Sequence, residues 1–216
     1  MDILILIIGI AGFALAIILH EVAHGLVAER LGDPTARLMG RLTLNPISHI
    51  DIVGSIILPL TLLILRSPFL FGWAKPVPVD PYNLQHPKKD LALISLAGPL
   101  ANISFALVLS IFLRIILTVF PNTNIFAMFF YVIEFNIALA VFNLIPVGPL
   151  DGAKILTGLL PNKQAKAFGD FLDKFGMILI LALIFPIFGG SSLVTLVISP
   201  VINVFLKLLI PGFSSI

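Results

Sequence analysis

The stretch "AIILHEVAHGLVAE", from Ala16 to Glu29, places His20, Glu21 and His24 in the middle of a long apolar run. The whole chain has the composition of a membrane protein, because 59% of its residues are hydrophobic and 11% are charged. Soluble domains carry about 25% charged residues. A charged side chain at membrane depth costs about 2.5 kcal/mol or more. Three ionisable side chains in one span therefore indicate a functional polar site.

The apolar runs of the chain predict an all-α polytopic membrane protein. They lie at residues 3–28, 52–71, 91–120, 125–145, 175–188 and 193–210. Because a helix needs about 20 apolar residues to cross a bilayer, we expect a bundle of about five transmembrane helices and a re-entrant or interfacial segment at 52–71. The stretch "RLMGRLTL" (37–44) predicts a short β-hairpin around Gly40. We expect residues 1–216 to form one domain, without an appended soluble domain.

The chain contains no cysteine and has a formal net charge of only +2. The absence of cysteine excludes disulfides, iron–sulfur clusters and cysteine nucleophiles, so oxygen and nitrogen remain as the ligands for any metal. The small net charge gives no reason to expect nucleic acid as a partner. The basic residues are more useful as markers of membrane topology.

Residues 20–24 form an H-E-x-x-H sequence. Residues four apart on a helix lie on one face, about 6 Å apart along the axis, so both imidazoles can reach one metal ion. Glu21 lies beside this pair and can approach a water molecule rather than the metal. Zinc suits imidazole and carboxylate ligands, and it activates water for hydrolysis. The motif therefore predicts a hydrolytic zinc site.

A zinc site of this kind normally takes three protein ligands, so a third ligand must come from elsewhere in the chain. The candidates are His49, Asp51, His86, Glu134 and Asp151. Asp151 is favoured because "FNLIPVGPLDGAK" (142–154) ends a long apolar helix with two prolines and a glycine, and a broken helix can present a carboxylate into a cavity. The alternative role for Asp151 is an N-cap of the helix that follows.

Four segments of the chain resemble the site-2 proteases, a family of intramembrane zinc metalloproteases. They are "HEVAH" (20–24), "LNPISHID" (44–51), "AGPLAN" (97–102) and "NLIPVGPLDG" (143–152), and they occur in this order across most of the chain. The resemblance is to compact prokaryotic members without a PDZ or CBS domain. One departure is Gly148, where many relatives have a proline; this concerns the local backbone and not the metal.

The resemblance implies one zinc ion held by His20, His24 and Asp151. It implies that Glu21 is the general base of a peptide hydrolase. It also implies that Asn143 helps to hold the substrate or to stabilise the oxyanion. The predicted reaction is hydrolysis of peptide bonds within or near the transmembrane segments of membrane proteins.

Three further residues are candidates for binding the substrate. A transmembrane substrate must be unwound before cleavage, and the edge of the predicted hairpin, with Arg41 and Leu42, could hold it as an added strand. Asn102 could line the path of water or substrate, and an interhelical hydrogen bond is an equally good interpretation of this residue. The resemblance suggests single-span substrates such as anti-sigma factors or signal-peptide remnants.

The three metal ligands also determine a topology. His20 and His24 lie toward the C-terminal end of the first span, and Asp151 lies just past the end of the span at 125–145. These two spans must therefore run in parallel for the ligands to meet. The span at 91–120 must run in the opposite direction.

As a consequence, residues 52–71 must begin and end on one side of the membrane. We expect a break near Pro59 or near Ser67 and Pro68. Most basic residues then face the cytoplasm, in agreement with the positive-inside rule. The active site of this multi-pass protein is expected near the cytoplasmic leaflet of the cell membrane.

Two other classes of function use the same polar residues. A metal or small-ion transporter or channel could pass ions along them, but transporters often contain two related halves with interrupted helices, and this sequence contains no such duplication. A catalytically silent relative is disfavoured because the predicted base and all three predicted ligands are present.

Overall fold

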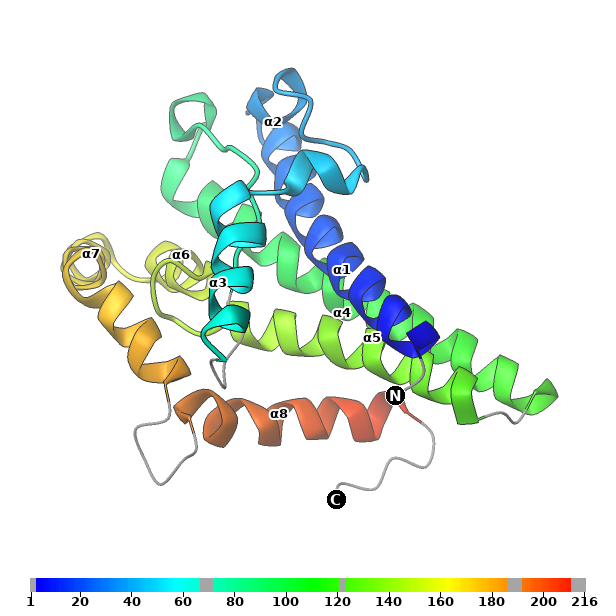
Figure 1. Ribbon diagram of the computed structural model, residues 1–216. Coiled ribbons are helices and arrows are strands. Elements are labelled where there is room, and N and C mark those ends of the chain that lie inside the picture. The colour runs from blue at the N-terminus through cyan, green and yellow to red at the C-terminus, as the bar shows by residue number, and fades with distance from the viewer. Residues whose placement is uncertain (1–2, 67–71, 121–122, 186–191, 211–216) are drawn as a thin grey trace.

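The computed structural model describes residues 3–66, 72–120, 123–185 and 192–210 (Figure 1). The α-helices are α1 (Ile3–Arg30), α2 (Thr35–Leu38), α3 (Leu58–Ile64), α4 (Pro87–Val119), α5 (Thr123–Asn143), α6 (Asp151–Leu159), α7 (Asn162–Ile184) and α8 (Leu193–Leu209). Short 3-10 helices cover Pro46–His49 and Pro81–Asn83, and a π-helix covers Ile52–Ile57. The described residues contain no strand, so the predicted all-α class is confirmed.

Helices α1, α4 and α5 form the centre of the molecule and pack against one another (Figure 1). The contacts of α4 run backward along α1, because Ile94 meets His24 whereas Asn102 meets Ala16. Helix α4 is therefore antiparallel to α1. It is also antiparallel to α5, which follows it directly in the chain and meets Asn102 through Asn136. Helices α1 and α5 consequently run in parallel, as the predicted ligand set requires.

Helix α8 lies along α5 and closes the apolar core (Figure 1). The buried members of this core are Ala106, Leu113, Ile133, Ile137, Leu206 and Ile210. The last carbonyls of a helix lack donors within the helix. Those of Leu208 and Leu209 accept hydrogen bonds from Arg114 of α4, at 3.1 Å each, and Leu209 also accepts from Ser110. The carbonyls at the end of α8 thus supply hydrogen-bond acceptors for the guanidinium of Arg114, which lies within an apolar helix.

Three helices of the described chain are long and apolar enough to cross a membrane. They cover Ile7–Arg30, Pro87–Val119 and Ile125–Asn143. The apolar helices at Ile52–Ile64 and Leu193–Leu209 are shorter. The 17 residues of α8 span about 25 Å, whereas the hydrocarbon core is about 30 Å thick. The chain has the helices of a multi-pass membrane protein, and the total of about five transmembrane helices stays a prediction.

The segment after Asp51 leaves the bundle and returns to the same place. Helical structure continues from Ile52 to Ile64, and the returning chain then donates hydrogen bonds from Trp73 N to Gly54 O (3.2 Å) and from Lys75 N to His49 O (2.9 Å). The chain before this segment and the chain after it thus lie together, and the predicted re-entrant or interfacial path of residues 52–71 stays a prediction.

One of the two break points expected in that segment is wrong. Helical structure runs through Pro59, because the π-helix Ile52–Ile57 is followed directly by α3 from Leu58. The other candidate break, at Ser67 and Pro68, lies outside the described residues.

The β-hairpin expected around Gly40 is not confirmed, because residues 35–38 form a single helical turn. The carboxylate of Asp33 accepts from Thr35 N at 3.1 Å and so holds the start of this turn. Gly40 ends it with a φ of 65° and donates from its N–H to Arg37 O at 2.9 Å; glycine adopts this conformation without steric cost. An isolated two-stranded hairpin is only marginally stable, so local capping determines the structure here.

Candidate metal centre

His20, His24 and Asp151 meet in the interior of the bundle, although more than a hundred residues separate the aspartate from the histidines. Asp151 Oδ2 lies 3.0 Å from His20 Nε2 and 3.2 Å from His24 Nε2. All three side chains are buried, with exposed fractions of 5%, 9% and 8% for His20, His24 and Asp151. The predicted ligand atoms therefore form one compact, shielded cluster.

Hydrogen bonds on the far side of each imidazole determine which nitrogen faces this cluster. His24 Nδ1 lies 2.7 Å from the carbonyl of Ile94, which can only accept, so Nδ1 carries the proton. His20 Nδ1 lies 2.7 Å from Oδ1 of Asn102, whose amide nitrogen donates to Ala16 O and to Asn136 Oδ1. In the neutral imidazoles this proton on Nδ1 leaves the Nε2 lone pair free on the side of the carboxylate, which is the tautomer a metal ligand needs.

This donor set fits zinc. Three acceptor atoms directed at one point repel one another unless a cation lies between them. The ligand atoms of a tetrahedral zinc ion are roughly 3.3 Å apart, given bonds of about 2.0–2.1 Å, and the separations from Asp151 to the two histidines are 3.0 and 3.2 Å. Two imidazoles and a carboxylate are also the ligand types that catalytic zinc uses.

The surroundings of Asp151 also favour its charged form. Burial by itself raises the pKa of this carboxyl, but when the two histidines are protonated and no metal is bound, their hydrogen bonds and charge outweigh burial and hold the pKa below its usual range. The carboxylate is therefore charged at neutral pH and available as a ligand.

The chain reverses between α5 and α6 to bring Asp151 to the histidines. Helix α5 ends at Asn143, and the following residues form turns up to Leu150. Asp151 is the first residue of α6. Gly152 allows this approach, since a Cβ there would lie 2.3 Å from the carbonyl oxygen of Leu144. The prediction that a broken helix presents Asp151 agrees with this geometry.

Gly98 of α4 is a part of the site that the sequence reasoning missed. A Cβ at this position would lie 2.6 Å from Cε1 and Nε2 of His24 and 2.7 Å from Cε1 of His20. The absence of a side chain therefore leaves the space that the two imidazoles occupy. Glycine in a membrane helix signals a close contact, but the sequence does not identify what makes that contact.

A cavity of about 160 Å³ lies beside the metal cluster. Its lining includes Glu21, Asn143, Pro76 and Val77 in addition to the three ligands. Oε2 of Glu21 accepts a hydrogen bond from Val77 N at 2.7 Å, and Nδ2 of Asn143 donates to Leu139 O at 3.0 Å. Both predicted catalytic side chains thus share one small cavity with the ligands.

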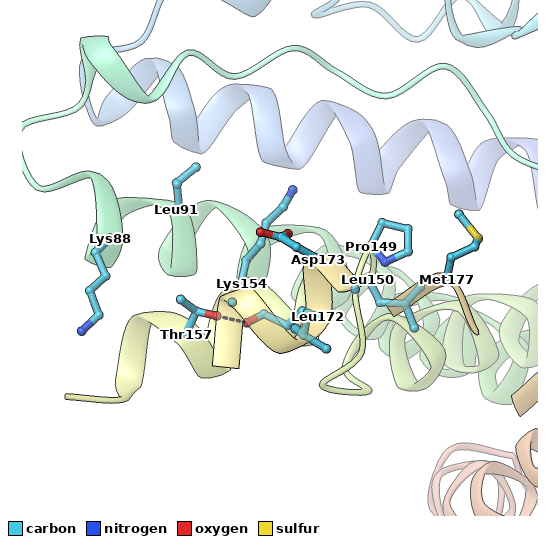
Figure 2. A pocket seen from close by; sticks show the side chains of 12 residues that line it. Lys88, Leu91, Pro149, Leu150, Lys154, Thr157, Leu172, Asp173 and Met177 are labelled. Atoms are coloured by element: carbon cyan, nitrogen blue, oxygen red, sulfur yellow. Dashed lines mark hydrogen bonds between the residues drawn. The ribbon is translucent and has the colours of Figure 1, made fainter. Parts of the chain in front are cut away.

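A larger cavity of about 520 Å³, shown in Figure 2, shares part of its lining with the first. Leu91, Pro149 and Lys154 line both cavities. The remaining wall of the larger cavity is mostly apolar and includes Leu150, Leu172 and Met177. The two cavities therefore lie next to each other, with the larger one between α4, α6 and α7.

The three residues predicted to bind substrate lie elsewhere. Asn102 has no exposed surface and contacts His20 from behind, so its contacts agree with the interhelical alternative. Arg41 is buried, with 6% exposed, and donates to Lys75 O at 2.7 Å. Leu42 packs toward α1, where a Cβ at Gly25 would meet its Cδ2 at 2.5 Å. The structure does not bring these three side chains into the cavity beside the metal cluster.

The other candidates for the third ligand have different surroundings. His49 Nε2 lies 2.8 Å from Thr43 O, and Asp51 accepts from Gly54 N at the start of a helix. His86 precedes α4 as its N-cap residue. Glu134 lies within α5. Among the described residues, only Asp151 joins the two histidines in a metal-sized cluster.

Comparisons with known proteins agree with this geometry. The sequence model described as peptidase family M50 matches residues 8–185. A protein of Bacillus subtilis named "Putative zinc metalloprotease YwhC" is 36% identical over 182 residues, which cover 81% of this chain and 78% of that protein. A protein of Mycolicibacterium smegmatis named "Putative zinc metalloprotease Rip2" is 30% identical over 188 residues, which cover 84% of this chain and 68% of that protein. No solved structure matches the chain significantly.

Proposed function

Because the chain belongs to peptidase family M50, the site-2 protease family of zinc metalloproteases, we propose that it is an endopeptidase that cleaves membrane proteins within or near their transmembrane segments. The observation that carries this proposal is the position of the cluster. His20 and His24 lie on α1, one of the three helices of the described chain that are apolar enough to span a membrane, and Asp151 reaches them from the start of α6, which follows another of the three. Hydrolysis would therefore take place among the membrane helices.

His20, His24 and Asp151 would hold the zinc ion, and Glu21 would act as the general base. Zinc, when bound, polarises the carbonyl of the scissile peptide bond and lowers the pKa of a water molecule. Glu21 takes a proton from the attacking water and returns it to the leaving amine. Asn143 has a second amide N–H besides the one that donates to Leu139 O. This second N–H can stabilise the oxyanion.

The size of the cavity beside the cluster supports an unwound substrate. A volume of about 160 Å³ equals roughly five water molecules of about 30 Å³ each, whereas a helix is about 10 Å across. This small volume favours a locally unwound backbone over an intact helix. The adjoining cavity of about 520 Å³ offers space for residues that flank the scissile bond.

The orientation in the membrane and the substrates are part of the same proposal. With the ends of α1 and α5 that carry the site on the cytoplasmic side, Lys75, Lys88 and Lys154 face the cytoplasm, as the positive-inside rule requires. The site then lies near the cytoplasmic leaflet. The substrates would be single-span membrane proteins, for which anti-sigma factors and signal-peptide remnants are the first to try. A metal transporter or channel is not favoured, because the relatives carry names of zinc metalloproteases.

The experiment that tests this function compares purified wild-type protein with Glu21→Gln. Both proteins are reconstituted with a panel of single-span substrates, zinc is measured by elemental analysis, and products are located by mass spectrometry. Glu21→Gln should keep zinc and lose about 10²–10⁴-fold in cleavage rate. Cleavage of the panel only at sites far from the transmembrane segments, or equal rates for the two proteins, would contradict the proposal.

A further inference from the structure

Residues 72–80, which we name the strap, form a segment without regular secondary structure that lies beside the metal cluster. Hydrogen bonds hold the strap at both ends. Trp73 N and Lys75 N donate to carbonyls of the segment before α3, at 3.2 and 2.9 Å. Asp80 N donates to the buried carboxylate of Asp33 at 2.7 Å. The strap is therefore a fixed part of the molecule.

The middle of the strap contacts Glu21 through one backbone group. Val77, only 8% exposed, donates from its N–H to Glu21 Oε2 at 2.7 Å. Its neighbours Pro76 and Pro78 have no N–H, so this part of the strap offers a single donor. A Cβ at Gly25 of α1 would lie 3.0 Å from Val77 Cγ1, which shows how closely the strap lies on α1.

Glu21 needs an anchor of this kind. It follows His20 directly, and successive residues on a helix point about 100° apart, so the contacts that hold the imidazole do not hold the carboxylate. A carboxylate with no donor can turn about its last torsion. The bond from Val77 fixes Oε2 and leaves Oε1 to accept a proton from water.

Arg41 holds the strap close to this contact. Its guanidinium is buried, with 6% of the residue exposed, and Nη2 donates to Lys75 O at 2.7 Å. Among the described residues no carboxylate pairs with this charge, and Nε has no hydrogen-bond partner. Lys75 is thus held at its N–H by His49 O and at its carbonyl by Arg41, two residues before Val77.

We propose that the strap is a positioning element for the general base, with the Val77 N–H orienting Glu21 and Arg41 holding the strap in register. The proposal rests on the proposed role of Glu21. It assigns Arg41 a positioning role, in place of the direct substrate contact expected from the sequence. A carboxylate that is free to turn should lower kcat, because catalytic geometry is sensitive to displacements of about 1 Å. Substrate binding and zinc affinity should change little.

Enzymatic assays of variants test whether the Val77 N–H and Arg41 affect catalysis. Val77→Pro removes the N–H, and Val77→Ala removes most of the side chain but keeps the N–H. We expect kcat of Val77→Pro to be about 10- to 100-fold below that of Val77→Ala, with KM and zinc content equal. Ala74→Pro is the matched control in the strap, because the Ala74 N–H makes no hydrogen bond to any described residue. Arg41→Ala should lower kcat in the same way, and Arg41→Lys should restore part of it.

Amide hydrogen exchange tests the contact itself, without any substrate. Glu21→Ala should speed exchange of the Val77 amide about tenfold and leave the Lys75 amide unchanged, with or without zinc. Glu29→Ala is the control, since Glu29 pairs with Arg37 and not with the strap. Unchanged exchange at Val77 in Glu21→Ala, or equal kcat for Val77→Pro and Val77→Ala, would overturn the proposal. An inactive wild-type protein would instead contradict the proposed function. The exchange of the Val77 amide would still show whether Val77 N–H bonds to Glu21, because that measurement needs no activity.

Discussion

Substitution of Gly98 by alanine should weaken zinc binding, because the metal site has room for its imidazoles only where residue 98 lacks a side chain. An added Cβ lies 2.6 Å from two ring atoms of His24 and 2.7 Å from Cε1 of His20. Carbon atoms ordinarily approach one another to about 3.5–4.0 Å. The new methyl group thus overlaps two metal ligands at once, by about 1 Å.

The magnitude follows from this overlap. Overpacking of an interior costs about 1–3 kcal/mol, and ligand distances in a metal site tolerate only about 0.2 Å of change. If the imidazoles take up the strain, the dissociation constant for zinc should rise about 10- to 100-fold, since about 1.4 kcal/mol corresponds to a factor of ten. The helix itself should gain about 0.5–1 kcal/mol when alanine replaces glycine. Unfolding of the protein is therefore not expected to cause the loss of zinc.

The assay is competition for zinc against a chelator of known affinity, with thermal unfolding of the zinc-free protein measured in parallel. Gly169→Ala in α7 is the matched control, because a Cβ at that glycine meets no atom within 4 Å. The control should bind zinc like the wild type. The steric reasoning would be refuted if Gly98→Ala bound zinc as tightly as the wild type. It would also be refuted if Gly169→Ala lost as much zinc affinity as Gly98→Ala.

Three further predictions concern the ligands and the topology. Asp151→Asn should lose bound zinc and cleavage together, because a neutral amide is a poor zinc ligand; if Asp151 were only a helix cap, asparagine would serve as well, and elemental analysis would find full zinc. Asn102→Ala removes the acceptor that orients His20 and should weaken zinc binding about 10- to 100-fold. Asn102→Asp keeps an acceptor, so it should bind zinc more tightly than Asn102→Ala in the same chelator assay. A cysteine at Asn122 should react with an impermeant thiol reagent added outside intact cells and one at Gln85 should not, since the native chain has no cysteine; labelling at Gln85 would mean that residues 52–71 cross the membrane.

The sequence by itself determined the chemistry of the site. His20 and His24 share a helix, so the 3.6-residue period alone brings their imidazoles to one metal. The apolar runs identified the long helices, because hydrophobic length is a local property that needs no knowledge of packing. The requirement that Asp151 reach these histidines also predicted that α1 and α5 run in parallel. The site lies toward the C-terminal ends of both spans, and two C-terminal ends lie on the same side of the membrane only when the spans are parallel.

The tertiary structure alone decided what supports the site. Asn102 and the carbonyl of Ile94 orient the two imidazoles, Gly98 leaves space for them, and the Val77 N–H holds Glu21. No sequence pattern gives these contacts, because they join α1 to segments 56 to 82 residues away and depend on how closely the helices pack. The hairpin predicted around Gly40 is not confirmed for a related reason: residues 35–38 form a helical turn, and the hydrogen bond from Thr35 N to the carboxylate of Asp33 holds its start.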